Sequence, residues 1–138
     1  MSILRDLAKF TAGLNWNNLP ENIRREAEMK IMDNVAAGIG AGRNGQILRV
    51  VEEYKSLSGQ GNGAPVWSQG FSAPLFTAVF LNAMQTHTLE LDDVHTKSKA
   101  HIGTVVVPAA VSCASMLGST GKELAVAVAA GYEVTARI

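Results

Sequence analysis

The chain has 138 residues, the length of one ordinary domain, and its 12 Lys and Arg residues balance its 12 Asp and Glu residues. This balance excludes the basic footprint of a nucleic-acid-binding protein or of one attracted to an anionic membrane surface. Hydrophobic residues make up 47% of the chain, which argues against intrinsic disorder, whereas the charged fraction of 17% lies below the typical value of about 25%. So little charge indicates a chain that buries much of its surface against partners, or one that is a piece of something larger.

The single cysteine, Cys113, excludes an internal disulfide and any multi-cysteine zinc site. Near the N-terminus, Arg5 and Asp6 stand where a signal peptide needs an apolar run. The charge-free stretch 102–121 contains Pro108 and several serines. It is therefore too polar and too broken for a membrane helix, which needs about 20 predominantly apolar residues. We expect a cytoplasmic protein with no membrane contact.

The first part of the chain predicts three helices. Ser2 can cap the first helix, and Pro20 opens the second at a position where its missing N–H costs nothing. A third helix carries the apolar residues between 47 and 57 and is expected to end at 58–59. The second helix shows a strict four-residue apolar spacing, which predicts one buried stripe formed by Ile23, Ala27, Ile31, Val35 and Ile39.

Residues 59–71 are rich in Gly, Ser and Gln, which predicts a connecting loop that packs down through Trp67 and Phe71. We expect no strand pair or hairpin there. Ser72 is expected to cap a fourth helix, which would run from residue 73 to about residue 89.

The last part of the chain predicts two more helices. A fifth helix beginning at about Val105 would hold Pro108 in its first turn, where a proline is tolerated. Thr120 and Glu123 form a capping-box pattern for a sixth. The apolar spacing of this sixth helix continues to Ile138 without a stop signal. That pattern predicts the N-terminal part of a longer protein.

Charge placement is the most informative feature of the sequence. Residues 56–89 and 102–121 contain no Asp, Glu, Lys or Arg, and the acid-base residues gather between these two stretches. They comprise Glu90, Asp92, Asp93, His95, Lys97, Lys99 and His101, with His87 just upstream. Histidine titrates near neutral pH and a carboxylate can fix its tautomer, so the cluster suits proton-transfer chemistry. A solvated loop between two helices would carry charges too, and the residues alone leave both interpretations open.

Metal binding and nucleophilic catalysis are weaker interpretations. Asp92, Asp93, His95 and His101 could supply ligands for zinc, iron or manganese, but their spacing matches no compact metal motif. Cys113 lies in an apolar stretch, which is typical of a small core residue. We therefore expect neither a metal nor an activated thiolate.

Several segments together resemble the MmgE/PrpD family. The run His87-Thr-Leu-Glu-Leu-Asp-Asp-Val-His95 is followed by His101-Ile102-Gly103 and by residues 107–110, Val-Pro-Ala-Ala. The Pro20 helix start, residues 33–38 and residues 131–138 extend the resemblance over the chain. Two positions depart from the family pattern. Ile102 replaces the proline of the usual His-Pro-Gly, and Val94 stands where the decarboxylase branch has a threonine.

The resemblance implies a mainly α fold in which residues 1–138 form a helical-bundle-like portion of the family's large helical domain, without its smaller lid domain. It also implies a homodimer, a small polycarboxylate substrate and no metal or other cofactor. Asp92, Asp93 and His101 would line the active site, and His95 belongs to the same segment. The expected function is that of a dehydratase, a lyase that abstracts a proton next to a carboxylate.

An epimerase or isomerase of the same family and an inactive helical domain that forms a structural oligomer are the alternatives. The 138 residues lack the lid domain's catalytic groups, so we expect them to be inactive on their own.

Overall fold

The computed structural model describes residues 2–58 and 63–138, and this part of the chain is mainly α-helical, as predicted. The helices are α1 (Ile3–Gly13), α2 (Glu21–Ala41), α3 (Gly45–Ser58), α4 (Leu75–His87), α5 (Ile102–Leu117) and α6 (Gly121–Thr135). Two short antiparallel strands, β1 (Ala64–Val66) and β2 (Phe71–Ala73), form a hairpin between α3 and α4. Within these residues, no helix is both long and apolar enough to cross a membrane.

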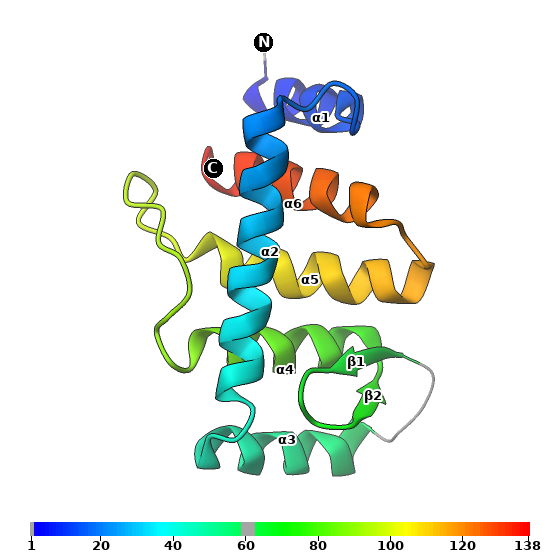
Figure 1. Cartoon of the computed structure of the whole chain (residues 1–138), viewed down its shortest axis with the longest axis vertical. Coiled ribbons are helices and arrows are strands. Elements are labelled where there is room, and N and C mark those ends of the chain that lie inside the picture. Colours follow the sequence, from blue (N-terminus) through cyan, green and yellow to red (C-terminus); the bar gives the residue numbers. More distant parts are fainter. Residues whose placement is uncertain (1, 59–62) are drawn as a thin grey trace.

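The helices form a stack that is crossed by one long helix. Figure 1 shows α6, α5 and α4 lying side by side, with α2 running across all three and with α1 and α3 at the two ends. One apolar core lies where α2 meets α5 and α6, around Ala27, Val107 and Val128. A second core joins α3, α4 and the hairpin around Val51 and Leu81. Helix α2 therefore ties the stack together, because it packs against α4, α5 and α6.

The buried face of α2 agrees only in part with the predicted stripe, since Ala27 is buried and Ile31 and Val35 are partly buried against the core. Its buried residues are Ala27, Asn34, Ala37, Gly38 and Ala41, whereas Ile23 is 38% exposed and Ile39 is 53% exposed. Each residue turns the helix by about 100°, so a spacing of four drifts by about 40° per step and leaves the contact face. Small residues occupy that face because the helix approaches its neighbours closely. A Cβ on Gly38 would lie 2.7 Å from the ring of Trp67.

The segment before α4 was predicted incorrectly. Residues 64–73 form a hairpin rather than a plain loop, and residues 59–62 lie outside the described part of the chain. The buried Asn82 side chain stabilises the first strand, because it accepts from the Trp67 N–H at 2.9 Å and donates to the Pro65 carbonyl at 3.0 Å. Ser72 pairs within β2 instead of capping a helix, and α4 begins after Pro74.

Helix α5 begins three residues earlier than expected. It starts at Ile102, so Pro108 lies in its interior rather than in its first turn. An interior proline costs about 3 kcal/mol through a lost backbone bond and a clash. Burial of Ile102, Val107 and Pro108 offsets this cost. Residues 104–107 are therefore helical.

Helix α6 was predicted correctly at its start and incorrectly at its end. The Thr120–Glu123 capping box is present, with the Glu123 N–H donating to Thr120 Oγ1 at 3.3 Å and the Thr120 N–H donating to Glu123 Oε2 at 2.7 Å. The helix ends at Thr135, so its predicted continuation to Ile138 is wrong. The Ser2 cap is also wrong in part, because Ser2 precedes α1 without a side-chain hydrogen bond to it.

Candidate active site

The acid-base residues lie where the end of α4 meets the start of α5. These neighbouring helices run in opposite directions, and the loop 88–101 that joins them projects from one side of the stack (Figure 1, yellow-green). His87 is the last residue of α4 and His101 immediately precedes α5. The loop folds back between these helix ends and carries Asp92 and Asp93 to them.

Asp92 joins the two histidines at the helix ends. Its side chain is fully buried, and its Oδ2 lies 2.9 Å from His101 Nδ1. Both of its carboxylate oxygens lie 3.1 Å from His87 Nδ1. The two imidazole rings are nearly perpendicular, with centroids 4.7 Å apart. We call His87, Asp92 and His101 the Asp92 cluster.

This geometry favours one tautomer of each imidazole ring. An ionised carboxylate can only accept hydrogen bonds, so both Nδ1 atoms carry the protons that point at Asp92. In a neutral imidazole with this tautomer, Nε2 is the unprotonated, basic nitrogen. The side chains of His87 and His101 are 44% and 32% exposed, whereas the carboxylate that joins them is fully buried.

Asp93 points into a separate group of side chains, although it adjoins Asp92 in sequence. Its Oδ1 accepts from Asn34 Nδ2 at 3.1 Å and from the Tyr132 hydroxyl at 2.8 Å, and its Oδ2 lies 3.2 Å from Lys30 Nζ. We call Lys30, Asn34, Asp93 and Tyr132 the Asp93 cluster. Gly103 leaves the space for it, since a Cβ there would lie 2.1 Å from Asp93 Oδ1.

The electrostatics of the Asp93 cluster keep the carboxylate charged and the phenol neutral. Burial acts to raise the pKa of Asp93, but the hydrogen bonds from Asn34, Tyr132 and Lys30 and the charge of Lys30 outweigh it, so the pKa is lowered. Burial and the adjacent Asp93 carboxylate raise the pKa of Tyr132 far above its ordinary value. Asp93 is therefore an ionised acceptor and Tyr132 a neutral donor.

The structure does not bring His95 into either cluster. Its Nδ1 lies 2.7 Å from Ser98 Oγ and accepts from the Ser98 N–H at 3.3 Å. A backbone bridge joins His95 and Ala100, in which the His95 N–H donates to the Ala100 carbonyl at 2.9 Å. Of the other charged residues in the loop, Glu90 lies 3.6 Å from His87 Nε2, and Lys97 and Lys99 are exposed.

The Asp92 cluster also has the donor atoms of a metal site. His87, Asp92 and His101 each offer one ligand atom, and these atoms lie within 4.8 Å of one another. Two imidazoles and a carboxylate suit zinc or iron. This set differs from the one considered from the sequence, because His87 replaces Asp93 and His95. The same contacts are complete as hydrogen bonds, and the absence of a metal remains a prediction.

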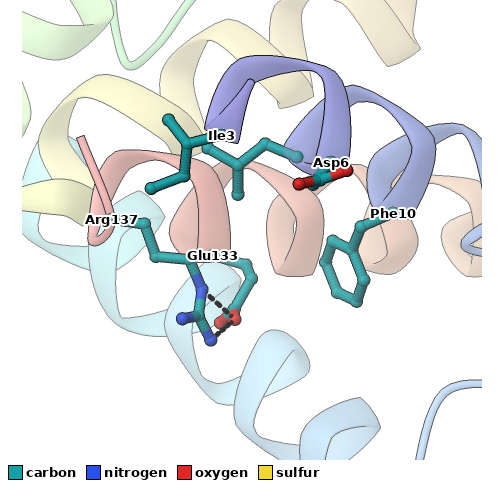
Figure 2. A pocket seen from close by; sticks show the side chains of 6 residues that line it. Ile3, Asp6, Phe10, Glu133 and Arg137 are labelled. Carbon is teal, nitrogen blue, oxygen red and sulfur yellow. Dashed lines mark hydrogen bonds and ion pairs between the residues drawn. The ribbon is translucent and has the colours of Figure 1, made fainter. Parts of the chain in front are cut away.

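Figure 2 shows a hollow whose lining residues belong to neither the Asp92 cluster nor the Asp93 cluster. It is formed between α1 and the end of α6 by Ile3, Asp6, Leu7, Phe10, Glu133 and Arg137. Glu133 and Arg137, which are four residues apart in sequence, pair with each other on one side of it. None of its lining residues belongs to the Asp92 or Asp93 cluster, so it does not define the acid-base site.

Sequence reasoning missed three residues of the Asp93 cluster. Lys30 and Asn34 lie four residues apart on one face of α2, and Asn34 is a fully buried polar residue among small apolar ones. A polar residue within such a face was the available signal. Tyr132 lies 39 positions from Asp93 in sequence, and its role depends on the packing of α6 against α2.

The comparisons with known proteins show the family to which the chain belongs. A sequence model of the MmgE/PrpD N-terminal domain matches residues 5–138, and the chain belongs to the MmgE/PrpD family. Cis-aconitate decarboxylase of Mus musculus is similar, with 25% identity over 142 aligned residues. The alignment covers 99% of this chain and 29% of that relative, so the chain spans under a third of the relative's length. The search of solved structures gave no significant match.

Proposed function

We propose that this chain supplies acid-base groups to an MmgE/PrpD-type lyase that removes water from a small polycarboxylate. The observation that supports it is the Asp92 cluster, in which one buried carboxylate orients two partly exposed imidazoles. A fixed carboxylate partner and an accessible Nε2 are the requirements for a histidine general base. The relative's printed name, a decarboxylase of cis-aconitate, supports the polycarboxylate substrate class.

In the proposed step, His101 Nε2 takes the proton from the carbon next to a substrate carboxylate. The electron pair of that C–H bond forms the new C=C bond, and the C–O bond to the neighbouring hydroxyl breaks. A proton from an acid converts the departing hydroxide to water. His87 in its imidazolium form is the proposed acid, since its ring stands beside that of His101 and shares Asp92 with it. The single charge of Asp92 balances one imidazolium, which suits one acid and one base.

There are two alternatives to dehydration. One begins with the same proton abstraction, and the other involves no catalysis. Reprotonation of the carbon from the opposite face would give epimerisation instead of elimination. A non-catalytic helical domain that covers its exposed apolar side chains by self-association is the third possibility. Leu57 and Phe76, which are 78% and 88% exposed, favour some covering partner.

The proposal is tested by following deuterium from solvent into candidate tricarboxylates and dicarboxylates, together with ultraviolet detection of the new double bond. The full product of the gene should be used, because the lid domain of the family contributes to the complete site. We expect His101→Gln and Asp92→Asn to lose about 100-fold or more in exchange rate, the usual range for a positioned acid or base being about 10²–10⁴.

His95→Gln is the matched comparison, because it removes a histidine of the same loop that bonds to Ser98 rather than Asp92. An equal loss in His95→Gln and His101→Gln would contradict the assignment. Exchange without water loss would identify the epimerase, and a self-associated protein with no exchange would identify the structural domain. Wild-type activity that disappears on chelation and returns with zinc or iron would replace the hydrogen-bonded mechanism with a metal-based one.

A further inference from the structure

The Asp93 carboxylate is held from several directions by segments far apart in sequence. Helix α2 contributes Lys30 and Asn34, and α6 contributes the Tyr132 hydroxyl. The start of α5 closes over the carboxylate at Gly103, where a side chain has no room. Because α2, α5 and α6 also pack on one another, the position of Asp93 is fixed by the core of the molecule.

The Asn34 side chain that donates to Asp93 is itself held in place by a further hydrogen bond. Asn34 is fully buried, and its Nδ2 donates to the Lys30 carbonyl at 2.9 Å as well as to Asp93. Thr86 of α4, which directly precedes His87, donates to the Asn82 carbonyl at 2.9 Å, and its hydroxyl lies 3.4 Å from the Asn34 carbonyl. Consecutive Cα atoms are about 3.8 Å apart, so a fixed Asp93 leaves Asp92 little freedom of position.

Both Asp93 oxygens are already engaged. Oδ1 accepts two hydrogen bonds and Oδ2 pairs with Lys30, while the side chain is only 12% exposed. A group that takes a proton from a substrate needs an accessible lone pair aimed at it. Asp92, by contrast, contacts two histidines whose side chains are partly exposed.

We propose that the Asp93 cluster is a positioning device, which holds Asp92 so that its carboxylate fixes the Nδ1-protonated form of His87 and His101. Asp93 itself does not touch the substrate. This inference rests on the proposed acid-base function, because positioning matters for catalysis only if those histidines act as acid and base. It assigns Asp93 a different role from the catalytic one expected from the sequence.

The test is ¹⁵N NMR of the full gene product labelled at histidine, which reports the nitrogen that carries each ring proton. We expect His101 to be protonated at Nδ1 alone and His87 to carry a proton at Nδ1 in both its neutral and its imidazolium form. As an internal contrast, we expect Nε2-protonated His95, which accepts from Ser98 at Nδ1. Tyr132→Phe and Asp93→Asn should turn the single form of His101 into a mixture and leave His95 unchanged. Tyr54→Phe is the matched control, since Tyr54 contacts Phe80 through its ring.

Kinetics separate positioning from direct participation. We expect kcat to fall about 10-fold in Tyr132→Phe and about 100-fold in Asp93→Asn, with KM changed less than about twofold, because small misplacements of reacting groups cost up to about 100-fold. Circular dichroism confirms the fold of each variant, and Tyr132→Phe is the milder change if Asp93→Asn does not fold.

Two results would overturn the positioning role. One is unchanged histidine spectra in folded Tyr132→Phe. The other is a complete loss of exchange in Asp93→Asn with wild-type histidine spectra, which would make Asp93 a direct participant. If the spectra change as expected but the wild-type protein exchanges no substrate proton, the positioning of the histidines stands and the proposed lyase function fails.

Discussion

Replacing Gly103 with alanine probes the space on which the Asp93 cluster depends. The new Cβ would lie 2.1 Å from Asp93 Oδ1 and 2.3 Å from Asn34 Nδ2. Non-bonded contacts between carbons are favourable at about 3.5–4.0 Å, so Oδ1 would have to move by more than about 1 Å. Such a shift breaks the bonds that Asn34 and Tyr132 donate, at 3.1 and 2.8 Å.

The expected effect follows from two opposing contributions. Alanine in place of glycine within a helix stabilises by about 0.5–1 kcal/mol. Each hydrogen bond lost to a charged group costs about 1.5–3 kcal/mol, and overpacking adds about 1–3 kcal/mol. Allowing for partial relaxation, we expect Gly103→Ala to lower the free energy of unfolding by about 2–4 kcal/mol.

Urea denaturation followed by circular dichroism measures this change. With an m-value of about 2 kcal/mol/M, the midpoint should fall by about 1–2 M. Gly40→Ala is the matched control, because Gly40 also lies in a helix and its Cβ would meet nothing within 4 Å. That variant should be slightly stabilised. If Gly103→Ala is as stable as wild type, the close packing around Asp93 is refuted.

Two pH effects follow from the Asp93 cluster. Because the pKa of Asp93 is lowered on folding, the Asp93 carboxylate stabilises the fold fully above its ordinary pKa of 3.8, and this stabilisation is lost as the pH falls below 3.8. The unfolding free energies of wild type and Asp93→Asn should therefore converge in acid. The measurement is urea unfolding at a series of pH values, and a constant difference between the two proteins would contradict the role of the charge. Because the pKa of Tyr132 is raised on folding, wild type should lose stability as pH rises above 10.0, where the unfolded chain ionises and the folded one does not. Tyr132→Phe should show a smaller alkaline loss, and ultraviolet titration of the native protein should show one tyrosine that resists ionisation.

The sequence predicted the helical class and most helices because these depend on local signals. The Thr120–Glu123 capping box is such a signal, and it is formed as expected. Local signals failed where packing decided the outcome. The face of α2 follows its close approach to α4, α5 and α6, and the hairpin depends on the amide of Asn82, a residue from the following helix.

The candidate site, like the fold, was predicted from the sequence only in part. The acid-base loop was visible in the sequence because its charges stand between two uncharged stretches, and Asp92 and His101 do meet in the structure. The different orientations of Asp92 and Asp93 were not predictable, since adjacent carboxylates look alike in a sequence. Asn34 lies 59 positions away from Asp93, and only the folded arrangement makes it a partner.

The backbone bridge between His95 and Ala100 separates the tip of the loop from the acid-base residues, so that changes at the tip need not move them. It closes residues 96–99 into a turn whose exposed Lys97 and Lys99 belong to neither cluster. Exposed loop tips tolerate insertion and substitution far better than the backbone that pins them. Evolutionary drift or engineering can therefore change the length and charge of this turn while His87, Asp92 and His101 keep their geometry.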